Sequence, residues 1–126
     1  MKRTKESREA QFFLERQLRK RILESRREDR SAVVAEAYCE LFRKFPNHSV
    51  FELSAADRRK RGVLSAGMIY PLLKRNADVL EVGCGRGDVL TILASMGFNC
   101  TGVEPSEHMI KMCSQHPNCK VLYGTA

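Results

Sequence analysis

The stretch DVLEVGCGRGDVL, residues 78–90, decides the fold of this chain. Its first part, residues 78–82, is rich in aliphatic residues and is typical of a short strand. Three glycines then occupy alternate positions, at Gly83, Gly85 and Gly87, before a second apolar segment. A strand, a glycine turn and an apolar run of helical spacing together predict a strand-to-helix turn.

The same pattern repeats toward the end of the chain. A helix is expected from Asp88 to Met96, ended by Gly97, and a second strand over 99–104. Residues 106–116 then predict another helix, and residues 120–123 a third strand. This alternation is typical of a parallel Rossmann-like sheet, so we expect an α/β fold of three layers with the strand order 3-2-1.

The residues before this sheet predict helices. The first 45 residues contain neither glycine nor proline and place apolar residues at helical spacing, with a break expected near residues 25–31. Ser54 to Asp57 has the form of a capping box, and two shorter helices are expected between there and residue 75. We therefore predict two domains: a basic helical extension over 1–50 and a sheet domain over 51–126.

Charge and cysteine content narrow the class of protein. Of the 22 Lys and Arg residues, 19 precede residue 77, against 10 of the 15 Asp and Glu residues. No apolar run is long enough to span a membrane, and no signal peptide is recognisable at the N-terminus. The five cysteines form no CxxC pair, which argues against a zinc site or a disulfide framework. We expect a cytoplasmic protein that holds no metal.

The glycine turn has the properties of an anion-binding loop. Glycine adopts positive φ easily and lacks the Cβ that would keep a ligand from the backbone, and the following helix favours negative charge at its N-terminus. The dinucleotide fingerprint GxGxxG has Gly or Ala in its sixth position, where this chain has Asp88, whose carboxylate would repel a pyrophosphate. This weakens a dinucleotide-binding interpretation and leaves it open.

Glu104 adds the second part of the predicted site. It ends the second strand, 19 residues after Gly85, where a parallel sheet brings its carboxylate beside the glycine turn. A carboxylate at this place can accept hydrogen bonds from ribose hydroxyls. An adenosine ligand with an amino-acid end and no pyrophosphate, such as S-adenosylmethionine, satisfies both features.

The residues from Glu81 to Gly87 resemble the E/DxGxGxG motif of class I S-adenosylmethionine-dependent methyltransferases. The segment Gly102-Val-Glu104-Pro-Ser106, continued to Met109, is similar to the GVDPS segment that follows this motif. The resemblance covers residues 60–126. It implies that S-adenosylmethionine is the cofactor and S-adenosylhomocysteine the product.

The resemblance also implies which residues bind the cofactor. Those expected at or beside its methionine end are Glu81, Val82, Gly83, Cys84, Gly85 and Gly87. Glu104 would bind the ribose hydroxyls, and Pro105 and Ser106 would border the adenine. Ser106 is also a candidate N-cap of the following helix, and Glu81 could instead accept bonds from loop amides. No residue of this chain is a candidate catalytic residue.

Sheets of this family continue with four more strands after the third, whereas this sequence stops at Ala126. We therefore expect an N-terminal portion of a methyltransferase, inactive by itself. The alternative is a naturally short chain that completes its sheet by dimerisation; the N-terminal helices are a second candidate surface for a homodimer.

Three functions remain open at this stage. The first is methyl transfer to a small-molecule or sugar-like acceptor. The second is modification of RNA, bound through the basic residues 1–30. The third is an NAD-type dinucleotide-binding protein or a non-catalytic nucleotide-binding module.

Overall fold

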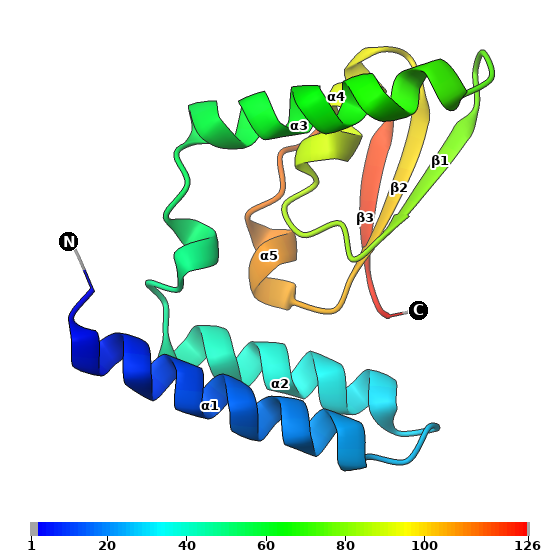
Figure 1. The fold of residues 1–126 in the computed structure, drawn as a ribbon. Coiled ribbons are helices and arrows are strands. Elements are labelled where there is room, and N and C mark those ends of the chain that lie inside the picture. Colours follow the sequence, from blue (N-terminus) through cyan, green and yellow to red (C-terminus); the bar gives the residue numbers. More distant parts are fainter. Residues whose placement is uncertain (1–2, 126) are drawn as a thin grey trace. The chain divides into compact units, whose positions relative to one another are not determined.

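The structure is a computed structural model that describes residues 3–125 (Figure 1). The chain forms two compact units, Met1–Glu52 and Leu53–Ala126. The first unit is helical and the second holds the sheet. Each unit is described by itself below.

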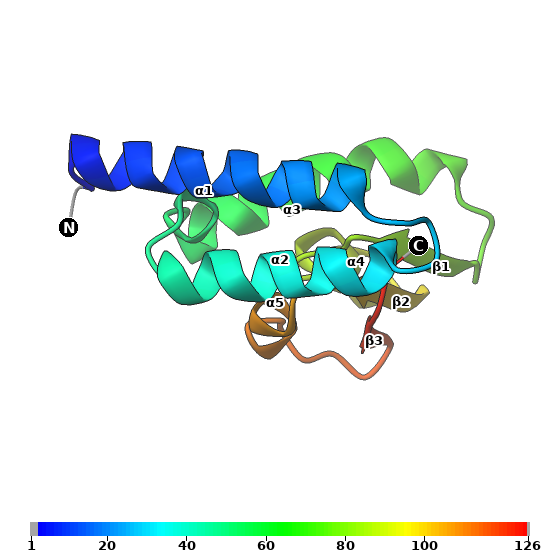
Figure 2. The same ribbon diagram turned by 90° about the horizontal axis from the view of Figure 1, so that it is seen from below.

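The first unit is a helical hairpin. Helix α1, Lys5–Glu24, and helix α2, Arg30–Lys44, lie side by side (Figure 2). Thr4 caps α1, because its side-chain oxygen accepts a hydrogen bond from the amide of Ser7 at 3.1 Å. The break expected near residues 25–31 is confirmed, and a short 3₁₀ helix, η1, Ser49–Phe51, follows α2. Apolar side chains at helical spacing hold the hairpin together: Leu14, Leu18, Ala37, Leu41 and Phe42 are buried.

The second unit begins with one long helix where two short helices were predicted. Helix α3 runs over Ala55–Ile69, and the hydroxyl of Ser54 caps it by accepting from the amide of Asp57 at 3.1 Å. Gly62 does not interrupt α3, because it is the contact point with the next helix and packing there stabilises the helix more than glycine weakens it. The helix ends before Pro71, in the 3₁₀ turn η2, Tyr70–Leu72.

The predicted three-stranded parallel sheet is confirmed. Strands β1, Asp78–Val82, β2, Asn99–Glu104, and β3, Cys119–Tyr123, are hydrogen-bonded in the order β1-β2-β3. This is the predicted order 3-2-1 read from the other edge. Val82 is in register with Val103, and Glu104 with Tyr123, so the carboxyl ends of all three strands meet at one edge.

Two helices connect the strands. Helix α4, Asp88–Ser95, joins β1 to β2, and helix α5, Glu107–Lys111, joins β2 to β3. Helix α5 is shorter than predicted. Pro117 disfavours helical backbone in the residue before it, and His116 forms a β-bridge with Cys119 instead.

The core of this unit lies between the sheet and α4, and α3 packs on α4 (Figure 1). Leu90 and Leu93 of α4 are almost fully buried against Cys100 of β2 and Ala66 of α3. In contrast, Leu80, Val82 and Leu122 of the strands are about half exposed or more. Among residues 3–125, no helix is long and apolar enough to cross a membrane.

Candidate functional site

A loop of left-handed backbone follows β1. Gly83, Gly85 and Gly87 have φ angles of +75°, +57° and +73°, a region that side chains other than glycine rarely adopt. The amides of Gly83 and Cys84 both donate to the carbonyl of Val103 in β2, at 2.7 and 3.2 Å. The amide of Gly87 donates back to the Cys84 carbonyl at 2.9 Å, which closes the turn into α4. The glycines are therefore required by the backbone conformation of the loop.

The space beside two of these glycines is open. A Cβ added to Gly83 or to Gly85 would have no protein atom within 4 Å, whereas one added to Gly87 would meet the hydroxyl of Thr91 at 3.9 Å. A ligand can thus approach the backbone at Gly83 and Gly85 closely, and any side chain there would occupy its place.

Glu104 is hydrogen-bonded to this loop. One oxygen of its carboxylate accepts from the amide of Gly85 at 2.7 Å, and the other accepts from the amide of Ser106 at 2.9 Å. The residue is only 5% exposed. The sequence predicted that Glu104 would lie near the glycines but not that it would tie the loop after β1 to the loop after β2. Hydrogen bonds to a charged acceptor are stronger than those to a neutral one. The Glu104 carboxylate, which accepts from two backbone amides, therefore stabilises the connection between the two loops more than a neutral acceptor would.

Glu81 is a half-buried carboxylate without a partner. Among residues 3–125 its side chain forms no hydrogen bond or ion pair with another side chain or the backbone. Burial raises the pKa of Glu81, and the negative charge of Asp88 raises it further. A cationic group placed beside Glu81 would oppose both effects, so the position suits an ammonium group.

Sequence reasoning missed the ion pair between Arg58 of α3 and Asp88. Their side chains are joined by a hydrogen bond of 2.8 Å from Nη1 to Oδ1, and both are partly buried. Asp88 is the first residue of α4, Gly87 occupies the N-cap position, and no side chain caps this helix. The only signal for this ion pair in the sequence was the run of four basic residues at positions 58–61. The run did not show which of the four faces the glycine loop.

The remaining predicted site residues differ in exposure. Val82 is 54% exposed, Cys84 is buried beneath the loop and Pro105 is half-buried. Ser106 is completely buried, and its hydroxyl accepts from the amide of Met109 at 3.2 Å, which is the N-cap geometry. Contact of these residues with a cofactor stays a prediction.

The buried thiols of this unit should react slowly. Burial, as the largest cause, raises the pKa of Cys84 to about 12 and that of Cys100 to about 11. Because the thiolate is the reactive form, we expect iodoacetamide to modify both on the order of 100-fold more slowly than the exposed Cys39 near neutral pH.

Peptide mass spectrometry over a time course measures these rates, and the same labelling in denaturant should remove the difference. Equal rates for Cys84 and Cys39 in the folded chain would contradict the burial described here.

No group of three or more metal-ligating side chains occurs among residues 3–125.

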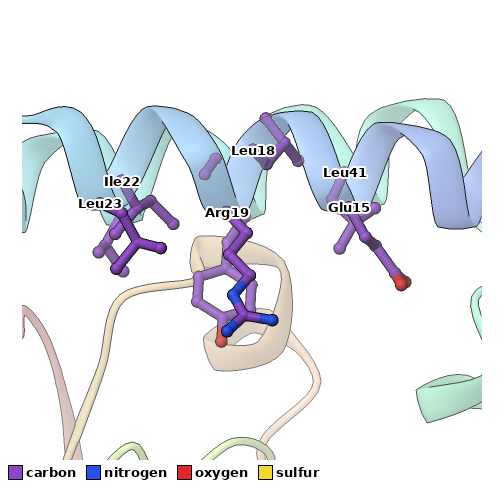
Figure 3. A pocket seen from close by; sticks show the side chains of 9 residues that line it. Glu15, Leu18, Arg19, Ile22, Leu23 and Leu41 are labelled. Atoms are coloured by element: carbon purple, nitrogen blue, oxygen red, sulfur yellow. The ribbon is translucent and has the colours of Figure 1, made fainter.

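A second concave surface lies on the helical hairpin (Figure 3). This groove has a volume of about 310 Å³ and lies between α1 and α2. Its lining is mostly aliphatic, and Figure 3 shows that Glu15, Arg19 and Leu23 point from α1 to the same side. The residues that line it are Glu15, Leu18, Arg19, Ile22, Leu23, Val34, Ala37, Tyr38 and Leu41.

The sheet unit corresponds to a known family. A model of the methyltransferase domain family matches residues 55–121, just over half of the chain. The chain therefore belongs to this methyltransferase family, which confirms the resemblance to class I S-adenosylmethionine-dependent methyltransferases. The match begins at the first residue of α3 and ends within β3.

Among solved structures, the chain is similar to a protein assigned as a methyltransferase from an antibiotic biosynthesis pathway of Anabaena variabilis. The two are 26% identical over 50% of this chain, with a TM-score of 0.47. The chain spans about a quarter, 26%, of the length of that protein. A search of curated protein sequences gave no significant match.

Proposed function

We propose that this chain binds S-adenosylmethionine for the methylation of a small-molecule or sugar-like acceptor. When bound, this cofactor supplies a methyl group activated by its positively charged sulfur. The observation that carries the proposal is the open cradle at Gly83 and Gly85, with a partnerless carboxylate at Glu81 on one side and Glu104 on the other. Membership of a methyltransferase family supports it.

The residues of the loop fit the parts of this cofactor. Glu81 can accept hydrogen bonds from the ammonium of the methionine end, while the bare backbone at Gly83 and Gly85 lets that end lie close. Each carboxylate oxygen of Glu104 accepts one amide and keeps a further lone pair, which the ribose hydroxyls can use. These residues would hold and orient the donor so that an acceptor could approach its methyl group.

The charge pattern of the helical hairpin supports a small acceptor over RNA. Many of its basic side chains pair with acidic ones of the same unit, which reduces the charge available to phosphates. The pairs are Arg3–Glu52, Lys5–Glu9, Lys20–Glu24, Arg21–Glu40, Lys44–Glu40, Arg26–Glu28 and Arg26–Asp29. The apolar groove between α1 and α2 is also of the size that small ligands occupy.

Isothermal titration of the 126-residue chain with S-adenosylhomocysteine tests the proposed cofactor. We expect saturable binding of this product and none of NADH. Binding of NADH without S-adenosylhomocysteine would replace the proposal by a dinucleotide-binding function. Tight binding of RNA that weakens with added salt would move the acceptor from small molecules to RNA.

A pair of glycine variants tests the place of binding. Gly85→Ala should weaken S-adenosylhomocysteine binding at least tenfold, because the new methyl group enters the open cradle. Gly97→Ala is the matched control: Gly97 also has positive φ, +95°, and no atom within 4 Å of an added Cβ, but it lies at the opposite end of α4. Both variants should lose similar stability in thermal unfolding. Equal loss of affinity in the two would show that backbone strain, rather than ligand contact, explains the effect.

A further inference from the structure

Arg58 has hydrogen-bonding capacity that the chain does not use. Its Nη1 donates to Asp88, while its Nε is buried and has no acceptor among residues 3–125. The side chain as a whole is 19% exposed. A buried donor without an acceptor is unfavourable, so the structure does not use the full hydrogen-bonding capacity of this guanidinium.

The position of this guanidinium is set by two contacts with α4. Asp88 is the first residue of α4 and directly follows the last glycine of the loop. Four residues after Arg58, Gly62 packs against the backbone of Asp88, with an added Cβ only 2.7 Å from its carbonyl oxygen. The guanidinium is therefore held at the end of the glycine loop where α4 begins.

Positive charge is concentrated at this end of the loop. Arg86 lies in the glycine loop itself; burial lowers its pKa, and the positive charge of Arg58 lowers it further. The N-terminus of α4 adds the positive end of its dipole. Asp88 offsets part of this charge, while Glu81 at the start of the loop provides negative charge. The loop thus has a carboxylate near one end and guanidinium groups near the other, an arrangement that suits a zwitterion.

We propose that Arg58 recognises the α-carboxylate of the cofactor's amino-acid end, with its guanidinium positioned by Asp88. This inference rests on the proposed function, because it concerns the same cofactor. Arginine suits the role since its charge is permanent and its planar fork keeps the donors of Nη2 after Nη1 has bonded to Asp88. The chain would then recognise two parts of the ligand: the adenosine, through Glu104, and the intact amino-acid group, through Arg58.

Two ligands that differ only in the carboxylate test this inference. S-adenosylhomocysteine carries it, and S-adenosyl-3-thiopropylamine is the same molecule without it. In Arg58→Gln the affinity for S-adenosylhomocysteine should fall roughly 10- to 100-fold, the range expected for a hydrogen-bonded charge, while the affinity for the amine should stay within about twofold. Arg58→Lys should lie between Arg58→Gln and the parent chain, because it keeps the charge and loses the fork.

Arg59→Gln is the matched control, since Arg59 is an exposed neighbour on α3 and should leave both affinities unchanged. An equal loss of both ligands in Arg58→Gln would assign Arg58 a structural role and overturn the inference, as would unchanged binding of S-adenosylhomocysteine. If the parent chain binds neither ligand, the proposed function itself fails. Thermal unfolding of each variant shows whether the fold is kept.

Discussion

Alanine at Gly62 is expected to lower the free energy of unfolding by about 1–3 kcal/mol, the usual cost of overpacking a tight contact. The same substitution at Gly67, on the same helix, should raise it by about 0.5–1 kcal/mol. The two glycines lie in α3, five residues apart, and share the gain in helix propensity that alanine brings. They differ in what surrounds them.

The cost at Gly62 comes from a backbone contact. An added Cβ would lie 2.7 Å from the carbonyl oxygen of Asp88 and 3.1 Å from its carbonyl carbon, and no change of rotamer can relieve this. Helix α3 would have to move away from α4, which would also disturb the Arg58–Asp88 ion pair one turn earlier. At Gly67 an added Cβ would meet no atom within 4 Å, so the gain in helix propensity remains.

Urea unfolding followed by circular dichroism measures both changes. Far-ultraviolet spectra should show that each variant keeps its helices. A stabilising effect of Gly62→Ala would mean that α3 and α4 are not in the close contact described here.

Removal of the Glu104 carboxylate should have the other large effect on stability. Glu104→Ala leaves the amides of Gly85 and Ser106 without their acceptor, and each such loss costs about 1–3 kcal/mol when the donor stays buried. The bond to Ser106 is buried and the bond to Gly85 only partly so, which lets water replace the latter. We therefore expect a total cost of about 2–4 kcal/mol.

Glu104→Gln should cost less, because the amide oxygen can still accept one of the two bonds while the NH₂ group faces the other donor. Glu107→Gln is the control: this exposed residue in the first turn of α5 should change stability by about 0.5 kcal/mol or less. Hydrogen exchange locates the loss. The amides of Gly85 and Ser106 should lose protection in Glu104→Ala, while that of Gly83, which donates to Val103, should keep it.

A change below about 0.5 kcal/mol in Glu104→Ala would contradict a role in joining the two loops. Binding of S-adenosylhomocysteine to the more stable Glu104→Gln then separates the two roles of this residue. Loss of binding in a folded variant would support ribose recognition, whereas normal binding would confine Glu104 to the structure of the loop.

The strands and most helix starts could be predicted because their signals are local. Periodicity placed β1 and β2 at their observed bounds, and Ser54 and Ser106 marked helix starts by side-chain capping. Where local signals were ambiguous, the prediction was wrong. Two short helices were predicted between Ser54 and residue 75, whereas α3 runs unbroken over Ala55–Ile69 and packs on α4 through Gly62, a contact distant in sequence.

The candidate site shows the same difference between what local sequence signals predict and what contacts between distant residues decide. The sequence by itself determined the parallel strand order, the methyltransferase family and the nearness of Glu104 to the glycine loop, since each follows from motif spacing along one chain. Only the tertiary structure decided that Arg58, among four consecutive basic residues, pairs with Asp88. The physical reason is that the face a helix presents to its neighbour depends on where the two helices touch. For α3 and α4 that contact is Gly62, and only the folded chain brings it against Asp88.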